Sequence, residues 1–472
     1  MTDRQNKDYD EHDPYSIERY AQRLIGKTFA QVIKDDVEPI VSDVEQEYTV
    51  SVENKRQKGG LGTLIEERFF HYAANSDQHA DFYEAGVELK VTPYRINPDG
   101  KKVAKERLII TMIDYNKVVQ ETFYTSHVWE KTKRILLIYY CFKQDVCTKL
   151  DYKIDYARLF SPSPHDEKII RHDYEKIIEK IREGKAHELS ESDTLYLGAA
   201  TKSSSSEIRR TQPFSMVLAK PRAFAFKTTY MTFVLNNYII PGRPQYESIL
   251  GADETDDFEA YVTRKLSSYK GMTISELCEE LEVTYSKRPK NLESMLAFRM
   301  LGIRGNNAEE FVKAGIKVKS IRVQKNGKIK ENMSFPTFKF TDIAEQTWET
   351  SDLREYLDET RFLFVIYGTN CTDELYFKGV MFWNIPYEDL EGDVRTVWSM
   401  TQKAITDGLI IEEIKGIHYS NLPKQSENPV CHVRPHGQNA SDTCELPDGR
   451  KFPKQSFWLN NTYIEEQIKT LG

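Results

Sequence analysis

Features that place a protein in a membrane or in an oxidising compartment are scarce in this sequence. No run of apolar residues approaches the roughly 20 needed to cross a bilayer. The first sixteen residues are polar and acidic, so they predict neither a signal nor a transit peptide. Only six of the 472 residues are cysteines, and no two of them form a Cys-x-x-Cys pair. We therefore expect a reduced cytoplasmic protein with no membrane association.

An excess of positive charge is also lacking, since the formal net charge is -8. That value alone argues against a polyanionic partner, but the charge is unevenly distributed. Residues 202–243 hold seven basic residues and one acid, and residues 317–330 hold six basic residues and no acid. Either stretch alone is compatible with a solvated surface; two in equivalent places favour contacts with nucleic acid. They supply the candidate DNA-binding residues Lys202, Arg209, Arg210, Arg222, Lys227, Lys317, Lys319 and Arg322.

The apolar periodicity predicts a mixed α/β protein. Hydrophobic residues make up 39% of the chain and aromatic residues 12%, which is enough for two domains with separate cores and argues against disorder. Residues at helical spacing alternate along the chain with short, strongly apolar segments that are typical of buried strands. In the first half we expect helices over 14–24, 61–74 and 166–183, and strands over 85–93, 106–115 and 134–142.

The second half repeats the first. The phrase "EEFVKAGIKVKSI" matches "ADFYEAGVELKVT", and "RFLFVIYG" stands where "RILLIYYC" stood. Five elements recur in the same order, which indicates an internal duplication of one domain. A segment rich in Pro, Gly and acids separates the copies. We expect an N-terminal domain over 1–240, a linker over 241–260 and a C-terminal domain over 261–472.

The phrase "DFYEAGVELKVTP" carries the strongest chemical signal. Side chains two apart on a strand share a face, so Glu88 and Lys90 project together, and Asp81 can fold back beside Glu88 through the turn at Gly86. Two carboxylates so placed suit Mg²⁺. A lysine beside them can orient or help deprotonate an attacking water, or neutralise charge on a phosphate. This combination fits phosphodiester hydrolysis, whereas a solvated charged strand is the simpler alternative.

The second copy keeps the scaffold and loses two of the three carboxylates, since only Asp81 falls opposite another acid, Glu310. Lys317 replaces Glu88, while Lys319 keeps the position of Lys90. On the preceding helix, Ala297 stands opposite Glu66. These changes remove metal ligands and add charge that attracts phosphate. We therefore predict one catalytic copy and one copy that only binds.

Several motifs together resemble a known family. The phrases "KGGLGTLIEERFF", "DFYEAGVELKVTP", "ETFYTSHVWEKTKRILLIYY", "LYLGAATKSSSS" and "PRAFAFKTTYMTFVL" resemble, in order, the MutH family of GATC-specific endonucleases. The duplicated length resembles its restriction-enzyme branch, typified by the staphylococcal GATC restriction endonuclease. The resemblance implies an α/β protein of tandem MutH-like PD-(D/E)xK nuclease folds, the second of them catalytically degenerate.

The resemblance also implies roles for individual residues. It makes Asp81, Glu88 and Glu66 the metal ligands and Lys90 the catalytic lysine. It implies further catalytic lysines at Lys58 and at Lys131 or Lys133, of which we favour Lys131. By the same resemblance Lys202 lies on a DNA-contacting loop, and Arg222 and Lys227 lie on a segment that lines the DNA groove.

Three positions depart from the family pattern. Ala200 stands where the repair enzyme has an arginine, Ala225 where it has a tyrosine, and Ala80 where the "PD" proline is expected. The way this protein reads bases and their methylation therefore cannot be transferred from the repair enzyme. Direct reading in the major groove uses Arg, Lys, Asn or Gln, although phosphate contact is the commoner role. The residues that could serve are Asn236, Asn237, Arg209 and Arg210.

The resemblance implies an Mg²⁺-dependent type II restriction endonuclease that cuts double-stranded DNA on the 5′ side of the G in GATC. It also implies that the C-terminal copy binds a second GATC site as an allosteric effector. One catalytic copy per chain requires two chains or two successive nicks, and we expect a transient homodimer on DNA. The alternatives are a methyl-directed nicking enzyme like MutH and a GATC-binding regulator without catalysis.

Overall fold

The computed structural model shows a chain that divides into two units. The first comprises residues 1–246 with 252–256 and 312–315, and the second comprises 247–251, 257–311 and 316–472. Most of the second unit follows residue 257, and its first helix begins at Phe258. The bounds 1–240, 241–260 and 261–472 stay a prediction. The residues described are 8–36, 60–72, 79–203, 205, 207–242, 246–251, 255, 257–414, 417–439 and 441–469.

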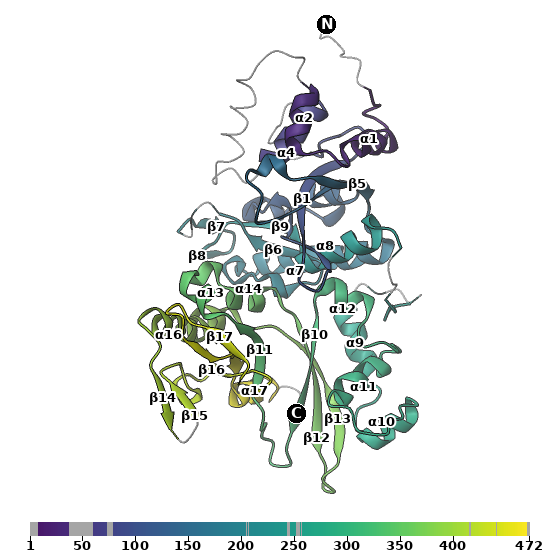
Figure 1. The fold of residues 1–472 in the computed structure, drawn as a ribbon. Coiled ribbons are helices and arrows are strands. Elements are labelled where there is room, and N and C mark those ends of the chain that lie inside the picture. The colour runs from purple at the N-terminus through teal and green to yellow at the C-terminus, as the bar shows by residue number, and fades with distance from the viewer. Residues whose placement is uncertain are drawn as a thin grey trace. The chain divides into compact units, whose positions relative to one another are not determined.

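The N-terminal unit is built on a four-stranded sheet of order β2-β1-β4-β5, in which β1 and β4 are parallel. Leu136 and Ile138 of β4 pack in one cluster with Ile17, Phe29 and Leu64, so α1, α2 and α4 cover that face of the sheet (Figure 1). A second sheet of order β3-β9-β6 and a two-stranded sheet, β7-β8, also belong to this unit. The elements are α1 Pro14–Ala21, α2 Phe29–Asp36, α4 Gly60–Leu64, β1 Glu88–Ile96, β2 Lys102–Ala104, β3 Leu108–Met112, α5 Tyr115–Val118, α6 His127–Thr132, β4 Ile135–Cys141, β5 Ile154–Phe160, α7 Pro164–Arg182, β6 Leu197–Thr201, β7 Arg210–Gln212, β8 Ser215–Ala219, β9 Arg222–Phe226 and α8 Thr228–Val234.

The long helix α7 shows how local signals fix the fold. The Ser163 hydroxyl caps its N-terminus by accepting a hydrogen bond from Asp166 N, and Pro164 occupies the first turn. Gly184 ends it with a φ of +74°, and a Cβ there would lie 2.7 Å from Phe214 O. The buried Asp173 carboxylate accepts three backbone N–H bonds from residues 195–197. Those hydrogen bonds connect α7 to the start of β6.

The C-terminal unit repeats this plan. In the sheet of order β10-β12-β13, β10 and β12 are parallel and β13 is antiparallel, as β1, β4 and β5 are in the first unit. Glu88 pairs with Ile135 in the first sheet, and Lys317 pairs with Phe362 in the second. A further sheet of order β11-β19-β16 corresponds to β3-β9-β6. The elements are α9 Phe258–Ser267, α10 Ile274–Glu280, α11 Leu292–Met300, β10 Lys317–Val323, β11 Met333–Phe338, α13 Phe340–Glu345, α14 Asp352–Glu359, β12 Phe362–Thr369, β13 Leu375–Trp383, α15 Tyr387–Asp389, α16 Arg395–Thr406, β14 Ile411–Ile414, β15 Ile417–Ser420, β16 Cys431–Pro435, β17 Thr443–Glu445, β18 Lys451–Pro453, β19 Gln455–Leu459 and α17 Asn461–Gln467; α12, Glu309–Ala314, spans a boundary between the units.

Alternate residues of β12 face two different layers. Phe362, Phe364 and Ile366 join the cluster that includes the β11-β19-β16 sheet. Tyr367, on the other face, donates a hydrogen bond of 2.8 Å to Glu293 O of α11. The central strand is therefore buried on both sides, which explains its continuous apolar sequence. None of the helices in the described ranges has the length and apolar character needed to cross a membrane.

Candidate active site

A tight turn brings Asp81 back to the start of β1. Phe82 and Val87 exchange two backbone hydrogen bonds, of 2.9 and 3.1 Å, across the turn. Gly86 makes this reversal with a φ of +60°, a conformation that favours glycine. Asp81 Oδ2 then accepts a hydrogen bond of 2.8 Å from Leu89 N. The structure thus places Asp81 beside Glu88, as the turn at Gly86 predicts.

Glu88 lies at the centre of the site and is 1% exposed. Its carboxylate contacts Lys90 Nζ at 2.7 Å and Lys131 Nζ at 3.3 Å. Lys131 is itself buried, on α6, a short helix whose N-terminus the Ser126 hydroxyl caps. Lys133 is exposed, and its side chain lies against Gly86. Of the two lysines that the sequence left open, Lys131 is the one in contact with the carboxylate.

Glu66 lies on the preceding helix, whose geometry differs from the continuous helix that the sequence predicts. The helix expected over 61–74 is observed as α4 followed by one π-helical turn, Ile65–Phe69, and His71 then takes a positive φ of 55°. Such turns occur often at functional sites because they redirect side chains without ending the helix. Glu66 lies in this turn, and its carboxylate is close enough to Asp81 and Glu88 for their charges to raise the Glu66 pKa.

Tyr72 is a neighbour that sequence reasoning did not single out. Its hydroxyl is buried and has no hydrogen-bond partner among the described residues. Burial raises the Tyr72 pKa, and the nearby charges of Asp81, Glu66 and Glu88 raise it further. A tyrosine at the end of an apolar helical stretch has the pattern of a core residue. The spacing of Tyr72 therefore did not indicate that it lies near the acids.

The carboxylates repel one another in a poorly solvated place. Burial raises the pKa of Asp81 from 3.8 to about 6, and the charge of Glu88 adds to this shift. Burial likewise raises the pKa of Glu66 from 4.5 to about 7, with a further contribution from Asp81. The raised pKa values of Asp81 and Glu66, next to the buried Glu88 carboxylate, fit a divalent cation with hard oxygen ligands, because the cation offsets both desolvation and repulsion.

Not all predicted residues join this site. Lys58 lies outside the described residues. Arg222 is 1% exposed and donates a hydrogen bond to Ala199 O. Lys227 is also buried and donates to Thr194 O. Both were expected to line a DNA groove, but here their charges point inward and stabilise the β6-β9 region, because the backbone carbonyls there need donors.

The loop and hairpin near β7 carry exposed charge. Lys202, Arg209 and Arg210 are all exposed there. Asn236 and Asn237, considered as base-reading residues, donate to backbone carbonyls instead: Asn236 to Lys102 O and Thr232 O, and Asn237 to Phe233 O. The exposed cations therefore remain candidates for DNA contact, whereas the two asparagine amides are engaged in the fold.

In the C-terminal unit the equivalent surface has a different chemistry. Lys317 is exposed at the start of β10, and Lys319 Nζ donates to Ser334 O at 3.2 Å. Arg322 contacts Glu293, a buried residue of α11, at 2.6 Å. Glu310, opposite Asp81 in the alignment of the copies, accepts bonds from the backbone of residues 249 and 250. The Asp81–Glu88 arrangement is therefore not reproduced by these described residues.

Comparison with known proteins gives a consistent result. The family described as DNA mismatch repair enzyme MutH matches residues 70–173 and 301–392, one stretch in each half of the chain. The type II restriction enzyme Sau3AI of Staphylococcus aureus is 34% identical over an alignment of 462 positions that covers 88% of this chain and 94% of that protein. The chain belongs to the Sau3AI and MutH family. The resemblance read from the motifs is thereby confirmed.

Relatives named as DNA mismatch repair protein MutH match less of the chain. The DNA mismatch repair protein MutH of Shewanella putrefaciens is 29% identical over 192 residues, 40% of this chain and 83% of its own length. That of Shewanella oneidensis is 28% identical over 185 residues, 39% of this chain and 80% of its own length. The two matched stretches of the MutH family contain β1 and β4 in the first unit and β10 and β12 in the second. Sequence and topology therefore both support a tandem pair of MutH-like folds.

Proposed function

We propose that this protein is a type II restriction endonuclease that cleaves double-stranded DNA on the 5′ side of the G in GATC. The observation that carries the proposal is the convergence of Asp81, Glu88 and Glu66 with Lys90 and Lys131 in the N-terminal unit. The similarity to Sau3AI over most of both chains supports the same reaction class. The GATC site is the family expectation stated from the motifs.

The cofactor we propose is Mg²⁺, held by Asp81 and Glu88 with Glu66 as the third acid. When bound, the ion supplies positive charge to the phosphate that is attacked. The Leu89 N–H donates a hydrogen bond that positions the Asp81 carboxylate, and Lys131 donates one to the Glu88 carboxylate. Lys90 is placed to orient the attacking water or to neutralise charge that develops on the phosphate.

The C-terminal unit is proposed to bind a second GATC site and to stimulate the first unit. Lys317 and Lys319 occupy the positions of Glu88 and Lys90, so this surface attracts phosphate and lacks the two-carboxylate arrangement. The exposed basic residues Lys202, Arg209 and Arg210 supply DNA contacts to the catalytic unit. We further propose that two chains pair transiently on DNA, because each chain carries one catalytic copy.

A plasmid assay tests these statements together. The full chain is incubated with plasmids carrying one or two GATC sites, with Mg²⁺ or EDTA, and with or without adenine methylation. We expect linear products with 5′ phosphates, no product in EDTA, and faster cleavage of the two-site plasmid. Equal rates on both plasmids would refute the effector role, and cleavage in EDTA would refute the metal requirement.

Matched variants separate the alternatives. Glu88→Gln keeps the size of the buried side chain and removes its charge, and we expect it to abolish cleavage while DNA binding persists. Glu84→Gln, in the exposed part of the same turn, is the control and should cleave normally. Nicks confined to hemimethylated sites would favour a repair-type enzyme, and a mobility shift without any cleavage would favour a regulator.

A further inference from the structure

A group of nitrogen and oxygen donors lies beside the carboxylate site. It consists of His79, which precedes Asp81 by two residues, and of His127 and Glu130 on α6. The spacing of three places His127 and Glu130 on one face of the helix. Each residue offers one donor atom, and these atoms all lie within 4.8 Å of one another.

The separations match those of a metal's ligands. His79 Nδ1 lies 3.0 and 3.2 Å from the two oxygens of Glu130, and His127 Nδ1 lies 3.6 Å from Glu130 Oε2. In a tetrahedral zinc site with bonds of roughly 2.0–2.1 Å, neighbouring ligand atoms are about 3.3 Å apart. The two imidazole rings lie 5.8 Å apart at an angle of 78°, so they approach the carboxylate from different directions.

A hydrogen bond between His79 and Glu130 is the simpler explanation, but it leaves one atom unexplained. His127 Nδ1 is buried and accepts or donates no hydrogen bond within the described part of the chain. A buried polar nitrogen that makes no hydrogen bond is uncommon, and an ion shared with Glu130 would satisfy it. Two imidazoles and one carboxylate are also a ligand set that suits zinc and similar transition ions better than magnesium.

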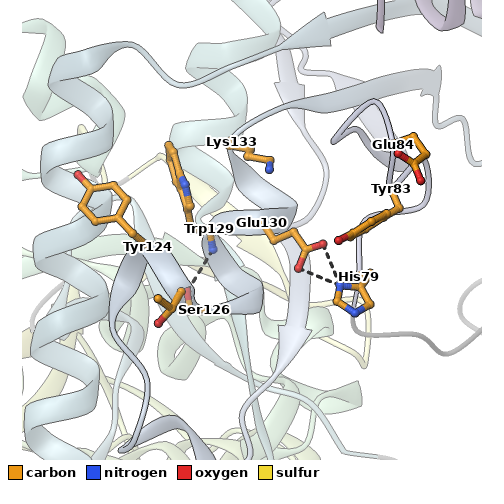
Figure 2. Close-up of a pocket in the computed structure, with 9 residues that line it drawn as sticks. His79, Tyr83, Glu84, Tyr124, Ser126, Trp129, Glu130 and Lys133 are labelled. Carbon is orange, nitrogen blue, oxygen red and sulfur yellow. Dashed lines mark hydrogen bonds and ion pairs between the residues drawn. The ribbon is translucent and has the colours of Figure 1, made fainter. Parts of the chain in front are cut away.

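The group borders an open pocket of about 460 Å³. Figure 2 shows the side chains of His79 and Glu130 pointing toward each other, with Tyr83 and Lys133 nearby. Tyr124, Ser126 and Trp129 line the other part of the pocket. The pocket leaves space for a water or another small ligand in a fourth position on the ion, as three-ligand zinc sites have.

We propose that His79, His127 and Glu130 bind a transition-metal ion, with Zn²⁺ as the best match, at a site separate from the three-acid site. The bound ion joins the segment before Asp81 to α6, which carries Lys131. It thereby fixes the distance between the segment before Asp81 and α6. The role of the ion is structural or regulatory. This inference goes beyond the proposed endonuclease activity and does not depend on it.

Cobalt is the probe, because tetrahedral Co²⁺ gives visible absorption that Mg²⁺ does not. The full chain carries Asp81→Asn and Glu88→Gln, which disable the three-acid site, and is titrated with Co²⁺ after chelator treatment. We expect one equivalent to bind with a tetrahedral spectrum and to be displaced by Zn²⁺. In this background, His79→Gln and His127→Asn should each weaken binding by roughly tenfold or more.

His12→Ala is the matched control, since His12 is exposed and has no part in the group. It should bind Co²⁺ as the parent does. His79 is also exposed, so its replacement tests binding without disturbing a core. Absence of a tetrahedral spectrum in the parent, or equal Co²⁺ affinity in the parent and the His79→Gln variant, would overturn the proposal. Neither readout involves DNA, so failure here leaves the endonuclease assay unaffected.

Discussion

Replacing Asp81 with asparagine should stabilise the metal-free protein while abolishing its activity. The pKa of Asp81 is raised from 3.8 to about 6, chiefly by burial and then by the charge of Glu88. The folded protein therefore holds this proton more tightly than the unfolded chain does. Consequently the free energy of unfolding falls as the pH rises from about 4 to about 6, and the loss is complete above the folded pKa.

The size of the effect follows from the pKa difference. At about 1.36 kcal/mol for each pH unit, the difference between 3.8 and about 6 corresponds to about 3 kcal/mol. Asp81 is partly solvated, so we expect Asp81→Asn to gain about 1–3 kcal/mol at pH 8. At pH 5 the gain should shrink to about half, because Asp81 is then mostly protonated in the folded state. The asparagine oxygen can still accept the bond from Leu89 N.

Urea unfolding in EDTA at pH 5 and pH 8 measures this gain, and hydrogen exchange of peptides covering β1 assigns the transition to the N-terminal unit. Addition of Mg²⁺ should then reverse the order, since the ion binds the wild type and adds stability that the variant cannot acquire. Glu84→Gln serves as the control for a charge change in the same turn. A variant no more stable than the wild type at pH 8 in EDTA would refute the reasoning.

Three further predictions concern the lysines and arginines. Lys131→Met should lower cleavage by about 100-fold or more and reduce folding stability by about 1–3 kcal/mol, because it removes a cation from the buried Glu88; plasmid linearisation and thermal unfolding measure the two effects. Arg222→Ala should reduce the free energy of unfolding by about 2–4 kcal/mol, which urea unfolding measures. Arg210→Ala should leave that free energy unchanged and should reduce the slope of log binding constant against log salt concentration by about one, which salt-titrated DNA binding measures. Lys319→Met should abolish stimulation by a second GATC site without reducing stability, which one-site and two-site plasmids together with thermal unfolding test.

Much of the fold was predictable because its signals are local. The strands β1, β3 and β4 and the helix α7 all lie where the apolar pattern predicts them. The position of Asp81 beside Glu88 followed from a turn that glycine permits and from the alternation of a strand. The repeat of five elements predicted the duplicated topology, which the paired sheets confirm.

What the sequence did not reveal depends on tertiary environment. Arg222 lies in a basic stretch that looks exposed, yet it is buried and its guanidinium donates a hydrogen bond to Ala199 O of β6. The π-helical turn at Glu66 has no periodicity of its own, so the segment looked like a continuous helix. The positions of Tyr72 near the acids and of His79 near His127 are set by packing between distant segments.

The duplicated strand shows why loss of the acids favours anion binding. In the first unit the charge of Lys90 is balanced by Glu88 at 2.7 Å. In the second, burial and the neighbouring charge of Lys317 lower the pKa of Lys319, so both factors disfavour its protonated form. A phosphate placed between these two lysines would offset both factors. Arg322 is already held by Glu293 and gains less from such a ligand. The replacement of one glutamate by lysine therefore does more than remove a metal ligand: it leaves the partly buried Lys319 beside a second cation, an arrangement that a phosphate would stabilise.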